Sequence, residues 1–187
     1  MILRKISKPN KPILVWERIK LLVFDCDGVL TDGRIIYDSA GNEAKNFDAH
    51  DGMGFLLLRQ TSILSAVITG RNSSLLERRC KDLKIGHLYQ GVSDKLQCLT
   101  RLLQELQLDF ANVLYMGDDW NDLQAMFNAA ISVCPADAPP NIRQLADHVT
   151  TLPGGRGAVR ECIEYVLHNQ GIYEQAVLSY LNQGQTP

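Results

Sequence analysis

Short apolar runs recur along this chain and alternate with stretches of helical composition. The apolar runs fall at residues 19–24, 63–68, 113–116, 130–133 and, more weakly, 148–150. Stretches typical of helices lie between them, at residues 52–60, 73–83, 93–106, 121–128 and 141–145. Short apolar runs of this kind suit strands that are buried on both faces, as in a parallel sheet. The alternation predicts an α/β fold with a doubly wound, Rossmann-like parallel sheet.

Other segments fall outside this alternation. Residues 34–47 predict a small β-hairpin, because turn residues at 38–42 separate two short extended stretches. After the glycine-rich residues 154–157, apolar residues at helical spacing indicate an amphipathic helix. We expect one domain over residues 19–170, an N-terminal arm at 1–18 and a C-terminal tail at 171–187.

Composition and charge exclude several classes of function. The net charge of −2 gives no basic surface for a polyanion, so we expect no nucleic-acid partner. We also expect no membrane contact, because no stretch approaches the roughly 20 apolar residues of a membrane span. The five cysteines are odd in number and form no CxxC pair, which argues against a disulfide framework or a zinc site. A cytoplasmic location follows from these expectations.

Acidic residues follow two of the apolar runs directly. Asp25 and Asp27 come after the run at 19–24, and Asp118, Asp119 and Asp122 follow the run at 113–116. Ligands of open α/β sheets bind beyond the carboxyl ends of the strands, where these two clusters would converge. Carboxylates packed together repel one another unless a cation lies between them. Oxygen ligands favour a hard ion, and Mg²⁺ is the simplest candidate.

Two further positions suit a phosphate group. Thr69 and Gly70 close the run at 63–68 and offer a hydroxyl and free backbone N–H groups. Lys95 stands at the start of a predicted helix, where its ammonium group can reach a phosphoryl oxygen. An isolated Asp-x-Asp is more often a turn or a helix cap. The ordered set of acids, hydroxyl and lysine argues against that simpler interpretation.

This ordered set resembles the four motifs of the haloacid dehalogenase superfamily. The first motif resembles Asp-Cys-Asp-Gly-Val-Leu-Thr at residues 25–31, the second Thr69, the third Lys95, and the fourth Gly-Asp-Asp-x-x-Asp at 117–122. The resemblance implies that Asp25 attacks phosphorus and forms a phosphoaspartate. It also implies that Asp27 protonates the leaving group and then takes a proton from the attacking water.

The same resemblance implies how metal and phosphate are held. The carboxylates of Asp25 and Asp118 and the backbone carbonyl of Asp27 would bind Mg²⁺. The Thr69 hydroxyl, the Gly70 N–H and the Lys95 ammonium would bind the phosphoryl oxygens. The carboxylates of Asp119 and Asp122 would orient Lys95 and the waters on the metal.

A closer resemblance covers about residues 19–170. The segment 27–33, the predicted hairpin, Phe47 with residues 51–54, Thr-Gly-Arg at 69–71 and residues 154–161 are similar to the 3-deoxy-D-manno-octulosonate 8-phosphate (KDO 8-phosphate) phosphatase family. It implies a phosphoric monoester hydrolase that releases KDO for lipopolysaccharide synthesis. It also implies a hairpin in place of a cap domain, and a homotetramer in which hairpins form a central barrel and a neighbouring subunit helps to close each active site.

The resemblance further implies a set of contacts with a phosphorylated sugar acid. The expected substrate-binding residues are Asp27, Asp48, Ala49, His50, Asp51, Gly52, Gly70, Arg71, Arg79, Lys95 and Asn121. His50 departs from the family pattern, in which arginine is common at this position. An imidazole can donate a hydrogen bond to a carboxylate but carries no permanent charge. Arg156 could serve a neighbouring site or lie free at the surface.

Three other interpretations compete with this one. The substrate could be a nine-carbon acid such as N-acylneuraminate 9-phosphate. The chain could be a catalytically idle oligomeric module, although every acid needed for turnover is present. A phosphotransferase such as a sugar mutase would normally have a cap domain, and the predicted hairpin at 34–47 is far too short to be one.

Overall fold

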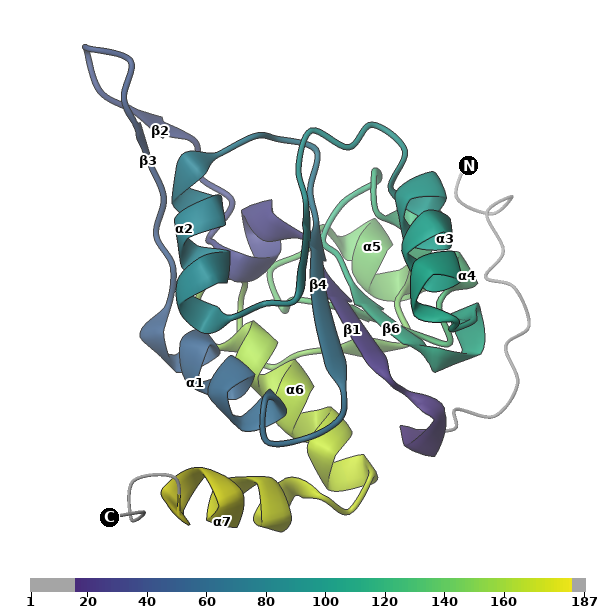
Figure 1. The fold of residues 1–187 in the computed structure, drawn as a ribbon. Coiled ribbons are helices and arrows are strands. Elements are labelled where there is room, and N and C mark those ends of the chain that lie inside the picture. Colours follow the sequence, from purple (N-terminus) through teal and green to yellow (C-terminus); the bar gives the residue numbers. More distant parts are fainter. Residues whose placement is uncertain (1–15, 183–187) are drawn as a thin grey trace.

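A six-stranded parallel sheet forms the centre of the computed structural model, which describes residues 16–182 (Figure 1). The strands are β1 Leu21–Phe24, β4 Leu64–Ile68, β5 His87–Tyr89, β6 Val113–Met116, β7 Ile131–Cys134 and β8 His148–Val149. Their spatial order is β5-β4-β1-β6-β7-β8. The chain leaves β1 in both directions, so the sheet is doubly wound and the predicted α/β fold class is confirmed.

Strand β1 is central because all four of its residues are apolar and buried. Its end aligns with the ends of both neighbours, since Phe24 pairs with Val67 of β4 and with Met116 of β6. Because β1, β4 and β6 are parallel and their ends align, the residues that follow these three strands meet at one edge of the sheet.

Helices cover both faces of the sheet (Figure 1). One buried cluster lies under α1 Ala49–Leu58, α2 Ser74–Leu83, α6 Ala158–Asn169 and α7 Tyr173–Asn182. The other lies under α3 Lys95–Leu106, α4 Leu123–Asn128 and α5 Pro140–Leu145. Leu22 and Phe24 of β1 point into the first cluster, and Leu21 and Val23 point into the second.

Two differences from the predicted elements have local causes. Strand β5 was not predicted, because its three residues are half-buried at the sheet edge and include His87 and Tyr89. Helix α1 begins earlier than predicted, at Ala49, because the Asp48 side chain caps it and accepts a hydrogen bond of 2.6 Å from the His50 N–H. The other predicted strands and helices occur with shifts of a few residues.

The predicted hairpin exists but its paired strands are shorter than expected. Strands β2 Ile36–Tyr37 and β3 Glu43–Ala44 pair antiparallel and project from the body of the molecule, at the upper left of Figure 1. The Asp38 carboxylate closes the turn and accepts hydrogen bonds from the N–H groups of Ala40 (2.9 Å) and Asn42 (2.8 Å).

Both ends of the described chain pack on the body. The Trp16 ring meets the Tyr165 ring of α6 edge-on, with centroids 4.9 Å apart. Helix α7 lies beside α1 and buries Ala176. Most of the predicted arm (residues 1–15) and the last residues of the tail (183–187) lie outside the described residues, so the domain limits stay a prediction. Among residues 16–182, no helix has the length and apolar character to span a bilayer.

Candidate active site

A cavity of about 250 Å³ opens at the carboxyl ends of β1, β4 and β6. Its lining residues are Asp25, Asp27, Gly33, Thr69, Gly70, Arg71, Asp118, Asp119 and Asn121. The tertiary structure thus brings together residues from three of the four predicted motifs. Lys95 of the remaining motif lies directly behind the cavity, with its Nζ 2.9 Å from Oδ1 of Asp25.

The turn that follows β1 aims Asp25 into this cavity. The Asp25 N–H donates to the Met116 carbonyl of β6 (2.9 Å), and the Thr31 N–H closes the turn on the Cys26 carbonyl (3.1 Å). Gly28 has φ +86° in the turn, and a Cβ atom there would lie 2.0 Å from Oδ2 of Asp118. Only glycine therefore allows the two acidic segments to approach this closely.

Two consecutive glycines, Gly154 and Gly155, contact the back of this turn. A Cβ atom on Gly154 would lie 1.8 Å from the Gly28 carbonyl oxygen, and the Gly155 N–H donates to the Val29 carbonyl (2.9 Å). The Gly154 N–H in turn donates to the Asp137 carboxylate (2.9 Å). The glycine-rich segment 154–157 therefore fixes the loop that carries Asp25.

The acids of the two clusters meet around Lys95. One carboxylate oxygen from each of Asp25, Asp118 and Asp122 lies within 4.8 Å of the others. The Lys95 ammonium donates to Oδ1 of Asp122 (2.7 Å), which also accepts from the Tyr115 hydroxyl (2.9 Å). Asp122 is fully buried, and its Oδ2 accepts from the N–H of Asp118 (3.2 Å). Asp122 therefore orients both Lys95 and the loop that carries Asp118.

Burial and mutual repulsion favour the protonated acids. Burial, and then the charge of Asp122, raises the pKa of Asp25 well above its usual range. Burial, and then the charge of Asp25, raises the pKa of Asp118 to about 8. Oδ1 of Asp25 is buried and has no well-directed hydrogen bond, although Lys95 lies nearby. The three carboxylates carry more negative charge than the single Lys95 ammonium balances, and their oxygens form a donor set that a hard divalent cation such as Mg²⁺ fits.

Asp27 stands at the rim of the cavity between two cations. Lys45, from the chain just after β3, donates a hydrogen bond to Oδ1 of Asp27. Nε of Arg71 lies 3.9 Å from Oδ2 of Asp27. Lys45 was not predicted from the sequence. The available signal was that Glu43 and Lys45 are two residues apart in an extended segment, so both point to one side of it.

Other predicted site residues lie away from this cavity in the single chain. Asp51 is buried and caps α6, accepting from the N–H groups of Gly157 (3.3 Å) and Arg160 (3.0 Å). Arg79 donates to the Asp48 carbonyl (2.7 Å). Ala49 is exposed, and Gly52 is buried against the Arg79 side chain. Residues 48–52 therefore contact the body of the protein and not the cavity.

His50 and Arg156 lie on a different surface. Both line a separate hollow of about 550 Å³ beside α6, without a residue of the acid clusters. Asp119, predicted to orient Lys95 and metal waters, is exposed, and its Oδ1 accepts from the Trp120 N–H (2.7 Å). The contacts predicted for His50 and Asp119 therefore stay predictions.

Comparison with known proteins identifies relatives over most of the chain. The sequence model of the haloacid dehalogenase-like hydrolases matches residues 59–160. The chain is 45% identical over 160 residues to the 3-deoxy-D-manno-octulosonate 8-phosphate phosphatase KdsC of Escherichia coli strain K12. That alignment covers 86% of the chain and 85% of KdsC.

Two solved structures have the same architecture. The 3-deoxy-D-manno-octulosonate 8-phosphate phosphatase of Moraxella catarrhalis, in complex with magnesium, phosphate and KDO, matches with a TM-score of 0.85 and 39% identity, over 88% of this chain and 95% of that one. The cobalt-bound deoxy-D-mannose-octulosonate 8-phosphate phosphatase of Haemophilus influenzae matches with a TM-score of 0.82 and 36% identity, over 87% of this chain and 98% of that one.

We predict that Mg²⁺ stabilises this protein more at high pH than at low pH. The pKa of Asp118 rises from 3.8 in an ordinary environment to about 8 in the folded protein, so the unfolded chain loses this proton first. Without metal, this group makes the free energy of unfolding fall as pH rises from about 4 to about 8. A bound cation stabilises the charged Asp118 carboxylate in the folded protein, and so offsets this fall in the free energy of unfolding.

Thermal unfolding with and without Mg²⁺ measures the effect. The rise in Tm caused by Mg²⁺ should be larger at pH 8 than at pH 5, and Asp118→Asn should reduce it at pH 8. An equal rise at both pH values would contradict the assignment of the acidic cluster as a cation site.

Proposed function

Because the chain belongs to the KDO 8-phosphate phosphatase family of haloacid dehalogenase-like hydrolases, we propose that it hydrolyses KDO 8-phosphate to KDO and inorganic phosphate. The observation that carries the proposal is the meeting of Asp25, Asp27 and Asp118 at one cavity, with Lys95 behind it. The proposed role is the supply of KDO for lipopolysaccharide, and a cytoplasmic location stays a prediction.

Asp25 is the proposed nucleophile. A carboxylate oxygen of Asp25 forms a bond to phosphorus while the bond from phosphorus to the sugar oxygen breaks. Asp27 gives its proton to that oxygen as the sugar leaves. Asp27 then takes a proton from water as the water oxygen bonds to phosphorus, which breaks the phosphoaspartate and restores Asp25. The position of Asp27 at the rim, two residues after Asp25, supports this division of roles.

The proposed phosphate site uses Thr69, Gly70 and Lys95. The Thr69 hydroxyl and the Gly70 N–H bind phosphoryl oxygens, and the Lys95 ammonium neutralises charge. Asp25, Asp118 and the backbone carbonyl of Asp27 would hold Mg²⁺. When bound, the ion neutralises negative charge on phosphate and on the acids.

Asp25→Asn tests the nucleophile. The amide oxygen cannot form the phosphoaspartate, so kcat/KM for phosphate release should fall by more than about 10³-fold, the scale on which loss of a nucleophile costs rate. Phosphate release is measured with Mg²⁺ present, and circular dichroism checks the fold. Asp82→Asn, an exposed acid on α2, is the matched control. Unchanged release by Asp25→Asn would eliminate the mechanism and leave the idle module as the better interpretation.

A sugar-phosphate panel tests the substrate. The 45% identity to KdsC supports the eight-carbon acid, whereas His50 replaces the arginine expected in the family. We expect kcat/KM to be higher for KDO 8-phosphate than for N-acylneuraminate 9-phosphate. Equal or better turnover of the nine-carbon substrate would overturn the substrate assignment but not the phosphatase mechanism.

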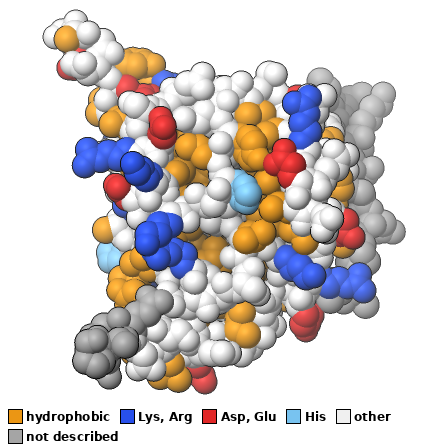
Figure 2. Space-filling view, viewed as in Figure 1, with side chains coloured by type: hydrophobic (Ala, Val, Ile, Leu, Met, Phe, Trp, Pro, Cys, Tyr) orange, Lys and Arg blue, Asp and Glu red, His pale blue; other side chains and the backbone are white. Residues whose placement is uncertain are grey.

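The proposed assembly is a homotetramer with shared active sites. Ile35 and Tyr37 on the projecting hairpin are 45% and 60% exposed, and Figure 2 shows apolar side chains along the hairpin. Exposed apolar groups on a projecting element suit contact with another subunit. The predicted substrate segment 48–52 does not line the cavity of its own chain. Both observations support a neighbouring subunit as the missing wall of the site.

Ile35→Lys should break this assembly, because burying four ammonium groups between hairpins is unfavourable. We expect light scattering to show smaller species, and kcat/KM to fall by about 10²-fold, the scale on which misplaced groups cost rate. Ile35→Val keeps the apolar surface and should remain tetrameric and active. A monomer with full activity would refute the shared site.

A further inference from the structure

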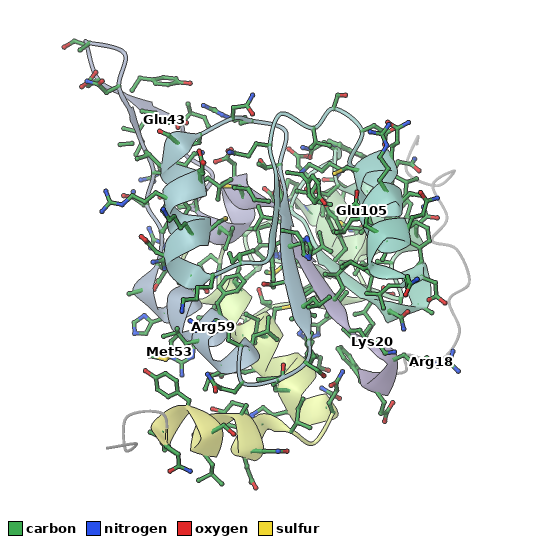
Figure 3. All side chains as sticks on the ribbon, in the orientation of Figure 1. Arg18, Lys20, Glu43, Met53, Arg59 and Glu105 are labelled. Atoms are coloured by element: carbon green, nitrogen blue, oxygen red, sulfur yellow. The ribbon has the colours of Figure 1, made fainter. Side chains whose placement is uncertain are left out.

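The segment that returns from the hairpin carries two charged residues toward the active site. Glu43 lies in β3 and Lys45 follows it by two residues, so both side chains point to the same side of the extended chain. Figure 3 shows Glu43 at the base of the hairpin, beside the start of α2. This side faces the cavity rim, because Arg71 and Asp27 contact these residues.

Glu43 binds the segment that follows the hairpin to the rest of the domain. Its Oε2 accepts a hydrogen bond from the Ser73 hydroxyl (2.6 Å), and its Oε1 accepts one from Nη2 of Arg71 (3.0 Å). Nη2 of Arg71 also donates to the Tyr37 hydroxyl (2.8 Å). These hydrogen bonds connect the hairpin to the loop at residues 71–73, close to Lys45.

The side chain of Lys45 is buried although it carries a charge. Its side chain is 2% exposed, and its Nζ donates to Oδ1 of Asp27 and lies 3.7 Å from Oε1 of Glu43. A buried ammonium group is costly unless it is paired, so its position is set by these carboxylates. Lys45 is absent from the lining of the cavity, whereas Asp27 lines it. Asp27 is therefore the lining residue that Lys45 contacts directly.

The two oxygens of Asp27 have different surroundings. Oδ1 is held by Lys45. Oδ2 lies 3.9 Å from Nε of Arg71, too far for a hydrogen bond. A carboxylate that is free at both oxygens can rotate about its last bond, whereas one held at Oδ1 presents Oδ2 in a fixed direction.

We propose that Lys45 is a positioning residue that holds Oδ1 of Asp27 and makes Oδ2 the atom that gives and takes the proton. The inference rests on the proposed phosphatase function. In the first step the proton on Oδ2 passes to the sugar oxygen as the bond from that oxygen to phosphorus breaks and Asp25 bonds to phosphorus. In the second step Oδ2 takes one proton of the attacking water as the bond between phosphorus and Asp25 breaks.

Substrates that differ in their need for this proton test the proposal. KDO 8-phosphate has an alkoxide leaving group that must be protonated, whereas p-nitrophenyl phosphate has a far more acidic leaving group that departs without a proton. We expect Lys45→Met to lower kcat/KM for KDO 8-phosphate at least about 10-fold more than for p-nitrophenyl phosphate, since general acid catalysis contributes about 10²–10⁴-fold. Lys45→Arg should recover part of the loss.

Controls separate positioning from folding. Lys81→Met removes an exposed lysine of α2 and should leave kcat/KM unchanged for both substrates. The Mg²⁺-dependent rise in Tm checks that the acidic cluster of Lys45→Met is intact. If the Met variant does not fold, Lys45→Gln, which keeps a donor of smaller size, is compared on the same two substrates.

A double variant tests whether Lys45 affects kcat/KM through the Asp27 carboxylate. Adding Lys45→Met to Asp27→Asn should cause no further fall in kcat/KM, because Lys45 acts through that carboxylate. The proposal would be overturned if Lys45→Met lowered kcat/KM equally for both substrates. It would also be overturned if Lys45→Met lowered kcat/KM further in the Asp27→Asn background. Absence of phosphate release by the wild-type protein would instead refute the proposed function, so the two failures are distinguishable.

Discussion

The site depends on the contact of Lys95 with two buried acids. Its ammonium lies 2.9 Å from Asp25 and donates to Asp122 at 2.7 Å, and these residues come from three different elements. Removing a buried cation leaves an uncompensated pair of carboxylates, which is strongly unfavourable. One lysine cannot balance three carboxylates, so the site retains the capacity for a divalent cation. The same carboxylates that repel one another therefore form the proposed cation site.

Glycine residues make this gathering sterically possible. Gly28 leaves room for Asp118, and Gly154 leaves room for the backbone of Gly28. The acidic loops can approach only because side chains are missing at both contacts. Segment 154–157 is therefore part of the active-site architecture although it contributes no group to the cavity lining.

The hairpin carries apolar and charged side chains with different tasks. Its exposed apolar residues, Ile35 and Tyr37, suit contact with another subunit. Its charged residues, Glu43 and Lys45, contact Arg71 and the general acid–base candidate, Asp27, at the cavity. A short two-stranded ribbon has little core of its own. Contacts at its base therefore carry its stability, and in the proposed tetramer contacts between subunits add to it, which links the proposed assembly to the geometry of Asp27.

The sequence by itself determined the fold class and the positions of Asp25, Asp27, Thr69, Lys95 and Asp118 at the ends of strands or the start of a helix. These follow from local patterns, because an apolar run and the residue after it are adjacent in the chain. Only the tertiary structure decided that Lys45 holds Asp27, that Asp51 caps α6, and that residues 48–52 lie away from the cavity of their own chain. These contacts join residues far apart in the sequence, and their partners are chosen by packing, which no local pattern encodes.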